Sequence, residues 1–241
     1  MPHSALWAIV GHMTGATPSR FDLNAADWDS NPSRAALATA VSDCIRKSLP
    51  LEPSTRVMDY GAGTGLVALQ LLPAVGEVVA VDTSREMLKV LTQKLVAAKI
   101  RNVTTALCDL QREPFTGAAF NLIVSSMTFH HIKDVAAVLG QFHAALKTNG
   151  RLAVADLDPD GGMFHPDPTD VAHPGFERAW LKQLLMKSGF VNVSDRTAHR
   201  LSKEGAGGVV REYSVFLITA EKGSFARSGG QDLLDGLQIG L

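Results

Sequence analysis

The chain has 241 residues, 46% of them hydrophobic and 20% charged, with a net charge of −1 at pH 7. These totals are typical of a globular protein with a sizeable core, and they lack the basic excess of nucleic-acid-binding domains. No run of about 18 apolar residues is present, so we expect no membrane span. Cys44 and Cys108 form neither a disulfide framework nor a zinc set. With no secretory signal visible at the start, we expect a cytoplasmic location.

The first fifth of the chain precedes the regular core pattern. Residues 1–20 mix Gly, Thr, Ser, Pro and His with some apolar residues, which predicts a disordered arm or a segment that orders over a ligand. Asn31-Pro32 predicts a helix start, with an N-cap residue followed by proline at the first helical position. An apolar stripe continues that helix to about Leu49, with Cys44 on its buried side.

From residue 56 onward, short apolar runs alternate with amphipathic segments. Strands are predicted at Arg56–Tyr60, Glu77–Val81, Val103–Leu107, Phe120–Ser125, Arg151–Asp156, Val191–Ser194 and Tyr213–Ala220. Helices are predicted at Gly65–Leu72, Ser84–Leu95, Val135–Leu146 (ended by Asn149-Gly150) and Phe176–Ser188. The expected fold is therefore an α/β, doubly wound Rossmann-like sheet of about seven strands, mostly parallel with an antiparallel C-terminal strand.

The same pattern divides the chain into an N-terminal arm and cap helix (1–54), a core (55–222) and a tail (223–241) that we expect to be disordered. The segment from Leu157 to Pro174 contains four prolines and predicts a long loop, a kind of segment that is often functional in compact domains. The polar, glycine-rich stretch Arg196–Arg211 predicts a second loop at the edge of the sheet. In the last helix, Trp180 and Leu184 are predicted to point inward.

The stretch Asp59–Gly65, with the sequence D-Y-G-A-G-T-G, joins the first predicted strand to a helix. Glycines let a ligand approach the main chain, and the helix start offers free N–H groups, so this turn predicts a site for a nucleotide-like ligand. A dinucleotide fingerprint would require Gly or Ala where Leu66 stands. Asp59 would also repel a diphosphate, whereas it suits a ligand that carries a positive group.

This turn resembles motif I of the class I S-adenosylmethionine (SAM)-dependent methyltransferases, and the resemblance extends over about residues 21–222. It implies SAM as the cofactor. The implied cofactor-binding residues are Asp59, Gly61, Ala62, Gly63, Thr64, Gly65, Asp82, Thr83, Met87, Cys108, Asp109, Leu110 and Ser125. Asp82, at the end of the second strand, is expected at the ribose hydroxyls, and Asp109 at the adenine amino group. Thr83 and Met87 are expected to flank the adenine, although a methionine at helical spacing is also ordinary core packing.

Two further stretches resemble parts of small-molecule methyltransferases. Phe21–Asp29 (F-D-L-N-A-A-D-W-D) resembles a segment that helps to cover the SAM site, so Phe21 and Trp28 are predicted to line the acceptor pocket, with simple packing as the alternative. The loop sequences around His165 and His173 resemble a loop that borders the acceptor pocket in a small bacterial and fungal group. Two alternatives stay open for these histidines, a metal or acid–base cluster with Asp167 and a solvated loop.

The candidate catalytic residues are His130 and His131, which follow the fourth strand. SAM carries an activated methyl group, so the protein need only align the acceptor, exclude water and, for some acceptors, remove a proton. A histidine titrates near neutrality and can act as that base. Because the two are adjacent, one is expected to face the cleft while the other packs, and a structural role is the alternative. No metal site is predicted, since His-His with Asp134 lacks a convincing ligand spacing.

The predicted function is methyl transfer from SAM to an O, N or S atom of a small-molecule acceptor. A quinone-ring C-methyltransferase would share the fold, and a non-catalytic SAM-binding protein would share the turn. A macromolecule methyltransferase is disfavoured by the near-neutral charge, which also predicts no nucleic-acid partner. An NAD-dependent enzyme is disfavoured by Leu66. The oligomeric state stays open.

Overall fold

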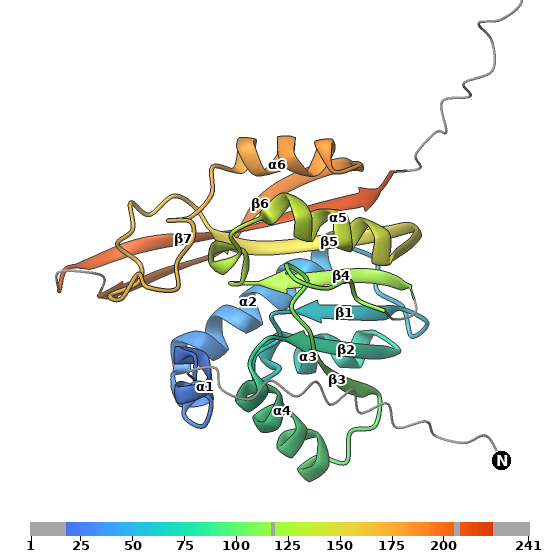
Figure 1. The fold of residues 1–241 in the computed structure, drawn as a ribbon, viewed down its shortest axis with the longest axis horizontal. Coiled ribbons are helices and arrows are strands. Elements are labelled where there is room, and N and C mark those ends of the chain that lie inside the picture. The colour runs from blue at the N-terminus through green and yellow to red at the C-terminus, as the bar shows by residue number, and fades with distance from the viewer. Residues whose placement is uncertain (1–17, 117–118, 205–207, 224–241) are drawn as a thin grey trace, which may run out of the picture.

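The computed structural model describes residues 18–116, 119–204 and 208–223. Residues 1–17 of the predicted arm (1–20) and residues 224–241 of the predicted tail (223–241) lie outside these residues, and the predicted domain boundaries stay predictions. Figure 1 shows one twisted sheet with helices on both sides. Within the described ranges, none of the helices combines the length and the apolar character that crossing a membrane requires.

The sheet has seven strands in the order β3-β2-β1-β4-β5-β7-β6. The strands are β1 (Arg56–Tyr60), β2 (Glu77–Asp82), β3 (Val103–Leu107), β4 (Phe120–Ser126), β5 (Leu146–Leu157), β6 (Phe190–Glu204) and β7 (Val210–Lys222). Strands β1 to β5 pair in parallel, whereas β7 runs antiparallel to both β5 and β6. The predicted seven-stranded, mostly parallel sheet is therefore confirmed. The strand order reverses between β1 and β4, and ligands of such sheets bind at the carboxyl ends beside this point.

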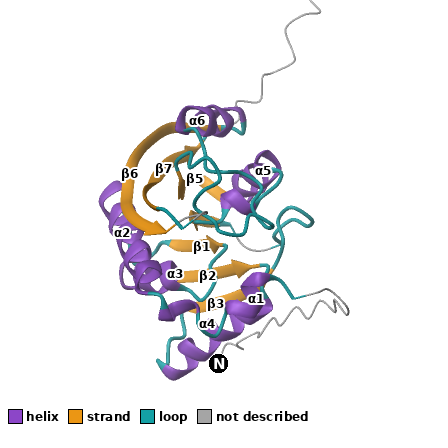
Figure 2. Ribbon diagram, turned by 90° about the vertical axis from the view of Figure 1, so that its left-hand side faces the viewer, coloured by secondary structure: helices purple, strands orange, loops and turns teal. Residues whose placement is uncertain are grey.

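Helices cover the two faces of the sheet in separate layers. They are α1 (Arg20–Asn24), α2 (Pro32–Ser48), α3 (Leu66–Leu71), α4 (Arg85–Ala97), α5 (Val135–Ala145) and α6 (Arg178–Lys187), with 3₁₀ turns η1 (Trp28–Ser30), η2 (Leu72–Ala74) and η3 (Phe129–His131). Figure 2 shows α2 and α3 on one side of the strands and α5 on the other. Successive side chains of β1 point to opposite faces of the sheet and pack in two separate cores. Val57 packs with α2, α3 and α4, whereas Met58 and Tyr60 pack with α5 and α6.

The helix starts follow local signals in the sequence. Asn31 accepts a hydrogen bond from the Ser33 N–H (2.9 Å) at the start of α2, with Pro32 in the first turn. Ser84 accepts from the Met87 N–H (3.2 Å) at the start of α4, and Asp134 caps α5. These caps fix where α4 and α5 leave the carboxyl ends of their preceding strands, which is where the candidate site lies.

The predicted helix stop at Asn149-Gly150 and the predicted strand start at Arg151 are wrong. Helix α5 ends at Ala145, and Asn149-Gly150 falls within β5 rather than ending a helix. The pairing of β4 with β5 jumps from Leu146 to Arg151 on the β5 side, so residues 147–150 form an irregularity, in which Asn149 adopts φ 59°. An Asn-Gly pair favours a left-handed turn, and here that turn lies inside a strand rather than after a helix.

The predicted loop over Arg196–Arg211 is also wrong. Strand β6 continues to Glu204 and β7 begins at Val210, and the two form a long antiparallel hairpin. The sequence predicts a loop here because β6 is an edge strand of the sheet, and edge strands need no continuous apolar face. Trp180 is likewise not inward. It is 47% exposed and stacks on Phe176, with ring centres 6.0 Å apart.

Phe142 in α5 connects the core to the end of β1. Its ring is fully buried and packs edge-on against Tyr60, with centres 5.3 Å apart. We expect Phe142→Ala to lower the free energy of unfolding by about 3–5 kcal/mol, because truncation leaves a cavity in a dense core. Urea denaturation would measure this. Met186→Ala, at a 53% exposed position of α6, is the control, with an expected change within about 0.5 kcal/mol. Equal changes in the two variants would contradict this prediction.

Candidate active site

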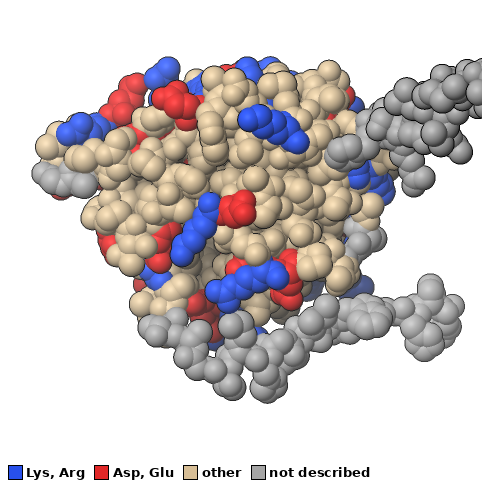
Figure 3. Space-filling model, turned by 45° about the horizontal axis from the view of Figure 1, so that its top comes forward, with Lys and Arg blue, Asp and Glu red and all other residues tan. Residues whose placement is uncertain are grey.

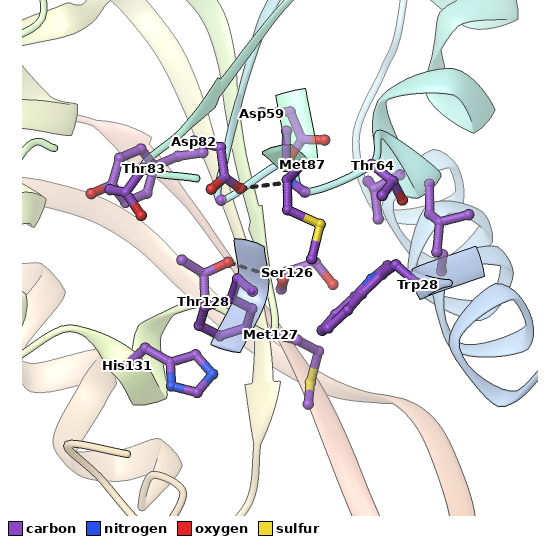
Figure 4. A pocket seen from close by; sticks show the side chains of 18 of the residues that line it. Trp28, Asp59, Thr64, Asp82, Thr83, Met87, Ser126, Met127, Thr128 and His131 are labelled. Carbon is purple, nitrogen blue, oxygen red and sulfur yellow. Dashed lines mark hydrogen bonds between the residues drawn. The ribbon is translucent and has the colours of Figure 1, made fainter. Parts of the chain in front are cut away.

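A cavity of about 230 Å³ lies at the carboxyl ends of β1, β2 and β4, and residues of α1, η1 and α2 line another of its sides. Figure 4 shows Asp59 and Asp82 at one end of the pocket, His131 and Met127 at the other, and the Trp28 ring along one side. The predicted site residues that line it are Phe21, Trp28, Asp59, Gly61, Ala62, Gly63, Thr64, Asp82, Thr83, Met87 and His131. The structure thus brings most of the predicted cofactor residues, and both predicted aromatic residues, to one place.

The glycine turn after β1 is fixed by backbone hydrogen bonds and by packing. The N–H groups of Gly61 and Ala62 donate to the carbonyl of Val81 in β2 (2.8 and 3.1 Å). Gly61 and Gly65 have positive φ angles, and a Cβ at these positions would overlap Thr128 and Leu91, respectively. Gly63 also has a positive φ, but a Cβ there would meet only the Met87 sulfur, 4.0 Å away. Gly61 and Gly65 therefore serve the packing, whereas Gly63 keeps one wall of the cavity open.

The two acidic residues of the pocket have different surroundings. Asp82 accepts hydrogen bonds from the N–H of Gly63 (2.7 Å) and of Ser84 (2.8 Å), and its burial raises its pKa. Asp59 is 1% exposed, and its Oδ2 has no hydrogen-bond partner among the described residues. Burial, reinforced by the charge of Asp82, raises the pKa of Asp59 to about 7. An unpartnered buried carboxylate oxygen in a pocket wall fits a ligand with a positive group.

Residues of α1 and η1 hold the cover of the pocket in place. The Ser84 hydroxyl donates to Asp22 (2.6 Å), and the Thr64 hydroxyl donates to Asp29 (2.6 Å), which also forms an ion pair with Lys94. The predicted covering segment is thus attached both to the glycine turn and to the start of α4. These attachments place Phe21 and Trp28 against the cavity, with their ring centres 5.9 Å apart.

Sequence reasoning missed part of the lining. The additional lining residues are Arg34, Leu37, Ala38, Tyr60, Leu66, Val67, Gln111, Ser126, Met127, Thr128 and Ile132. The guanidinium of Arg34, in the first turn of α2, lies 3.7 Å from the Trp28 ring centre, as in a cation–π contact. Met127 adopts φ 55°, a left-handed angle that is uncommon for a residue with a long side chain. No sequence signal marks that angle, since it arises where the chain leaves β4.

The predicted histidines separate into two positions. His131 lines the cavity, whereas His130 is 1% exposed and lies behind it, with Nδ1 2.7 Å from a carboxylate oxygen of buried Asp156. His165 lies beside His130, with the two Nε2 atoms 3.1 Å apart. His173 donates from Nε2 to the Ile132 carbonyl (3.0 Å). His165 and His173 line a second cavity of about 130 Å³ rather than the main one.

Burial and the neighbouring His130 together determine the ionisation of His131, His165 and Asp156. Burial lowers the pKa of His131 to about 4 and that of His165 to about 3, and His130 adds to both effects. Burial alone would raise the pKa of Asp156, but the neighbouring His130 and its hydrogen bonds outweigh this and hold that pKa below its usual range. At neutral pH, His131 and His165 are therefore neutral and Asp156 is charged.

Several predicted residues do not line the main cavity. They are Gly65, Cys108, Asp109, Leu110, Ser125, His130, His165 and His173. Cys108 and Leu110 are buried in the layer of α5 and α6, and Asp109 forms an ion pair with Arg112 (3.2 Å). The Ser125 hydroxyl donates to the Tyr60 carbonyl (2.9 Å), while its neighbour Ser126 lines the cavity. The two serines differ because successive strand residues face opposite sides of the sheet.

Comparison with known proteins agrees with this geometry. Residues 57–150, from β1 into β5, match a family described as a methyltransferase domain. An uncharacterized methyltransferase of Schizosaccharomyces pombe is 36% identical over 152 residues, which are 56% of this chain and 53% of that protein. The ubiquinone/menaquinone biosynthesis C-methyltransferase of Syntrophotalea carbinolica is 26% identical over 193 residues, covering 79% of this chain and 77% of that protein. The chain spans about half the length, or less, of several curated relatives.

The crystal structure of the YcgJ protein from Bacillus subtilis has the same fold. It superposes with a TM-score of 0.61 at 16% sequence identity, covering 76% of this chain and 98% of that one. The matched domain begins at β1 and includes the glycine turn, the acidic end of β2 and the strand order that places both at one edge. Residues 57–150 are therefore similar to the methyltransferase domain, and the sheet order and the glycine turn agree with the class I S-adenosylmethionine-dependent methyltransferases.

Proposed function

We propose that the chain binds SAM in the main cavity and transfers its methyl group to an O, N or S atom of a small-molecule acceptor. The buried carboxylate of Asp59 is the main support for this proposal. Its Oδ2 has no partner among the described residues, and an unsatisfied buried acceptor costs free energy until a ligand pairs with it. The ammonium group at the amino-acid end of SAM supplies such a pair.

The other walls suit the remaining parts of the cofactor. Both oxygens of Asp82 already accept a backbone N–H, but each keeps a second lone pair for a ribose hydroxyl. Thr83 and Met87 flank the same end of the cavity (Figure 4), where an adenine ring would pack. The segment after β3 reaches the cavity through Gln111, whose side-chain oxygen accepts from the Lys133 N–H. We propose that this segment contacts the edge of the adenine ring.

Methyl transfer requires that the acceptor be aligned with the methyl group and that water be excluded, more than it requires a reactive side chain. SAM supplies a methyl group that its own sulfonium activates. The chain aligns the acceptor between Trp28, Met127 and His131 and excludes water with the apolar rings of α1 and η1. The cavity of about 230 Å³ is somewhat smaller than the roughly 300–1,000 Å³ of typical ligand pockets.

A small acceptor is also supported by the distribution of charge. On the face shown in Figure 3, Lys and Arg side chains lie singly among neutral and acidic residues. Binding to a nucleic-acid backbone requires several basic residues that act together. The cavity also lies behind the cover formed by α1 and η1, which a polymer would have to displace.

Quinone-ring C-methylation is the second candidate, and the Syntrophotalea carbinolica relative favours it through the activity in its name. Transfer to a ring carbon ends with loss of a proton from that carbon, whereas transfer to a thiolate or phenolate does not. Among the two predicted catalytic histidines, His131 is the one that borders the cavity and can receive such a proton.

Two measurements test the proposed function together. Calorimetric titration with SAM should give saturable binding of one molecule per chain. Incubation with methyl-labelled SAM and a cell extract should label the small-molecule fraction, and S-adenosylhomocysteine should suppress that label. Mass spectrometry of the product identifies the acceptor atom, since a methyl on carbon resists the hydrolysis that removes a methyl ester. Absence of saturable binding, or label only in protein or RNA, would overturn the proposal.

A further inference from the structure

Three histidines from two distant segments meet behind the main cavity. His130 and His131 belong to η3, after β4, and His165 belongs to the loop between β5 and α6. One ring nitrogen from each lies within 4.8 Å of the others. The cluster adjoins the candidate active site through His131, which lines the cavity.

Two of these rings are oriented by hydrogen bonds on the side away from their Nε2 atoms. His130 Nδ1 lies 2.7 Å from a carboxylate oxygen of Asp156, and His131 Nδ1 lies 2.6 Å from the Asp170 carbonyl. A carboxylate and a carbonyl only accept, so each Nδ1 carries a proton, and in the neutral ring the lone pair of Nε2 is then available to another partner. This arrangement, with the second nitrogen bonded to a carboxylate or a carbonyl, is typical of histidines that bind metals.

The third ring places its nitrogen opposite His130. The Nε2 atoms of His165 and His130 are 3.1 Å apart, a contact that needs a proton or a cation between the two lone pairs. Two imidazole nitrogens on one tetrahedral zinc ion, each about 2.05 Å from it, lie about 3.3 Å apart. The observed separation is therefore close to that of two ligands on one ion.

From this geometry we propose that His130, His131 and His165 form a binding site for a divalent transition-metal ion such as Zn²⁺. Neutral imidazole is a preferred ligand of zinc and its neighbours, and sites with three protein ligands keep one position open. That position adjoins the cavity, where an ion would bind a hydroxyl or thiol of an acceptor as its anion. This consequence for the acceptor rests on the proposed function, whereas metal binding itself does not.

The charged groups around the three histidines have opposite effects on the binding of a cation. The buried carboxylate of Asp156 favours a cation, while the Arg20 guanidinium lies 3.4 Å from His131 Nε2 and opposes one. Arg20 also pairs with Asp170 (3.3 Å) and donates to the Asp167 carbonyl (3.2 Å). Arg20 belongs to α1, so the covering segment occupies one nitrogen of the site and must withdraw from it when an ion binds.

Titration of the chelator-treated full chain with Co²⁺ tests this site. We expect one equivalent to give the strong visible absorption of a four-coordinate ion, and Zn²⁺ to displace it. His165→Gln should weaken binding by at least about 10-fold, since it removes a ligand from a loop without opening the core. His173→Gln is the matched control, because His173 lies in the same loop and bonds to the Ile132 carbonyl instead. It should retain the affinity.

Arg20→Gln gives a second, opposite readout, because it removes the competing cation and should tighten binding several-fold. No saturable uptake of Co²⁺ by the unaltered chain would overturn the site. Equal affinity in His165→Gln, or a loss in His173→Gln as large as in His165→Gln, would overturn it too. The titration contains no SAM, so failure of metal binding leaves the proposed cofactor site to be judged by its own titration.

Discussion

Asp82→Ala is expected to lower the affinity for SAM by roughly 100-fold, which corresponds to about 2.8 kcal/mol. Asp82 has two tasks in the structure. It accepts from the N–H of Gly63 and of Ser84, and so it fixes both the glycine turn and the start of α4. Its side chain also lines the cavity, at the end proposed for the ribose. The alanine variant loses both the charge-assisted contacts with the ligand and the bonds that order the turn.

Graded substitutions separate these two tasks. Asp82→Asn keeps one acceptor oxygen without the charge, so we expect a loss smaller than that of Asp82→Ala. Glu86→Gln is the control, since Glu86 lies on the exposed side of α4 and pairs with Lys89. Calorimetry gives the affinities, and thermal unfolding shows that the variants fold. If Asp82→Ala binds SAM within about threefold of the unaltered chain, Asp82 is not a cofactor residue.

The features predicted correctly from the sequence are those that a short stretch determines. The glycine turn from Asp59 to Gly65 carries its own strand, glycines and helix start, and the acidic end of β2 follows from one apolar run. The seven-stranded sheet follows from repetition of the same pattern. Where local and tertiary preferences differ, as in the hairpin of β6 and β7, the polar sequence indicated a loop because edge strands bury little.

The relations missed by sequence reasoning join residues that are far apart along the chain. Asp29 reaches Thr64 only because η1 crosses the glycine turn. His165 reaches His130 only because the loop after β5 returns to the end of β4, whereas the sequence grouped it with His173 and Asp167. Arg34 and Trp28 both line the cavity and are in contact with each other. Each of these contacts depends on loop geometry, which hydrophobic periodicity does not encode.

Asp59 gives the second large effect, a dependence of SAM affinity on pH. Its pKa of about 7 in the free protein means that the carboxyl is largely protonated at pH 6. A cationic ligand favours the ionised form, so binding releases a proton. We expect the affinity to rise nearly tenfold per pH unit below pH 7 and to level off above it. Calorimetry in buffers of different ionisation enthalpy measures both the affinity and the released proton.

Asp59→Asn should weaken SAM binding at pH 8 and abolish this pH dependence. A surface replacement, Asp43→Asn, should retain it, because Asp43 lies in an exposed ion pair with Arg46. A slope that persists in Asp59→Asn would assign the proton to another group. Asp82, the charge that raises the pKa of Asp59, would then be the first residue to test.

The free energy of unfolding of the ligand-free protein depends on pH with the opposite sign to the SAM affinity. Its measurement therefore tests the Asp59 carboxyl without the ligand. The pKa of Asp59 rises from 3.8 to about 7 on folding, so between these values the folded chain binds more protons than the unfolded chain. Its free energy of unfolding therefore falls as the pH rises through this window and is constant with respect to this group above pH 7. From pH 5 to pH 8, Asp59→Asn should gain about 2–3 kcal/mol relative to the unaltered chain, at about 1.4 kcal/mol per pH unit. Urea denaturation at the two pH values measures this difference. A constant difference would mean that Asp59 is charged throughout, and the rise of affinity with pH would then be lost as well, because both effects come from the same proton.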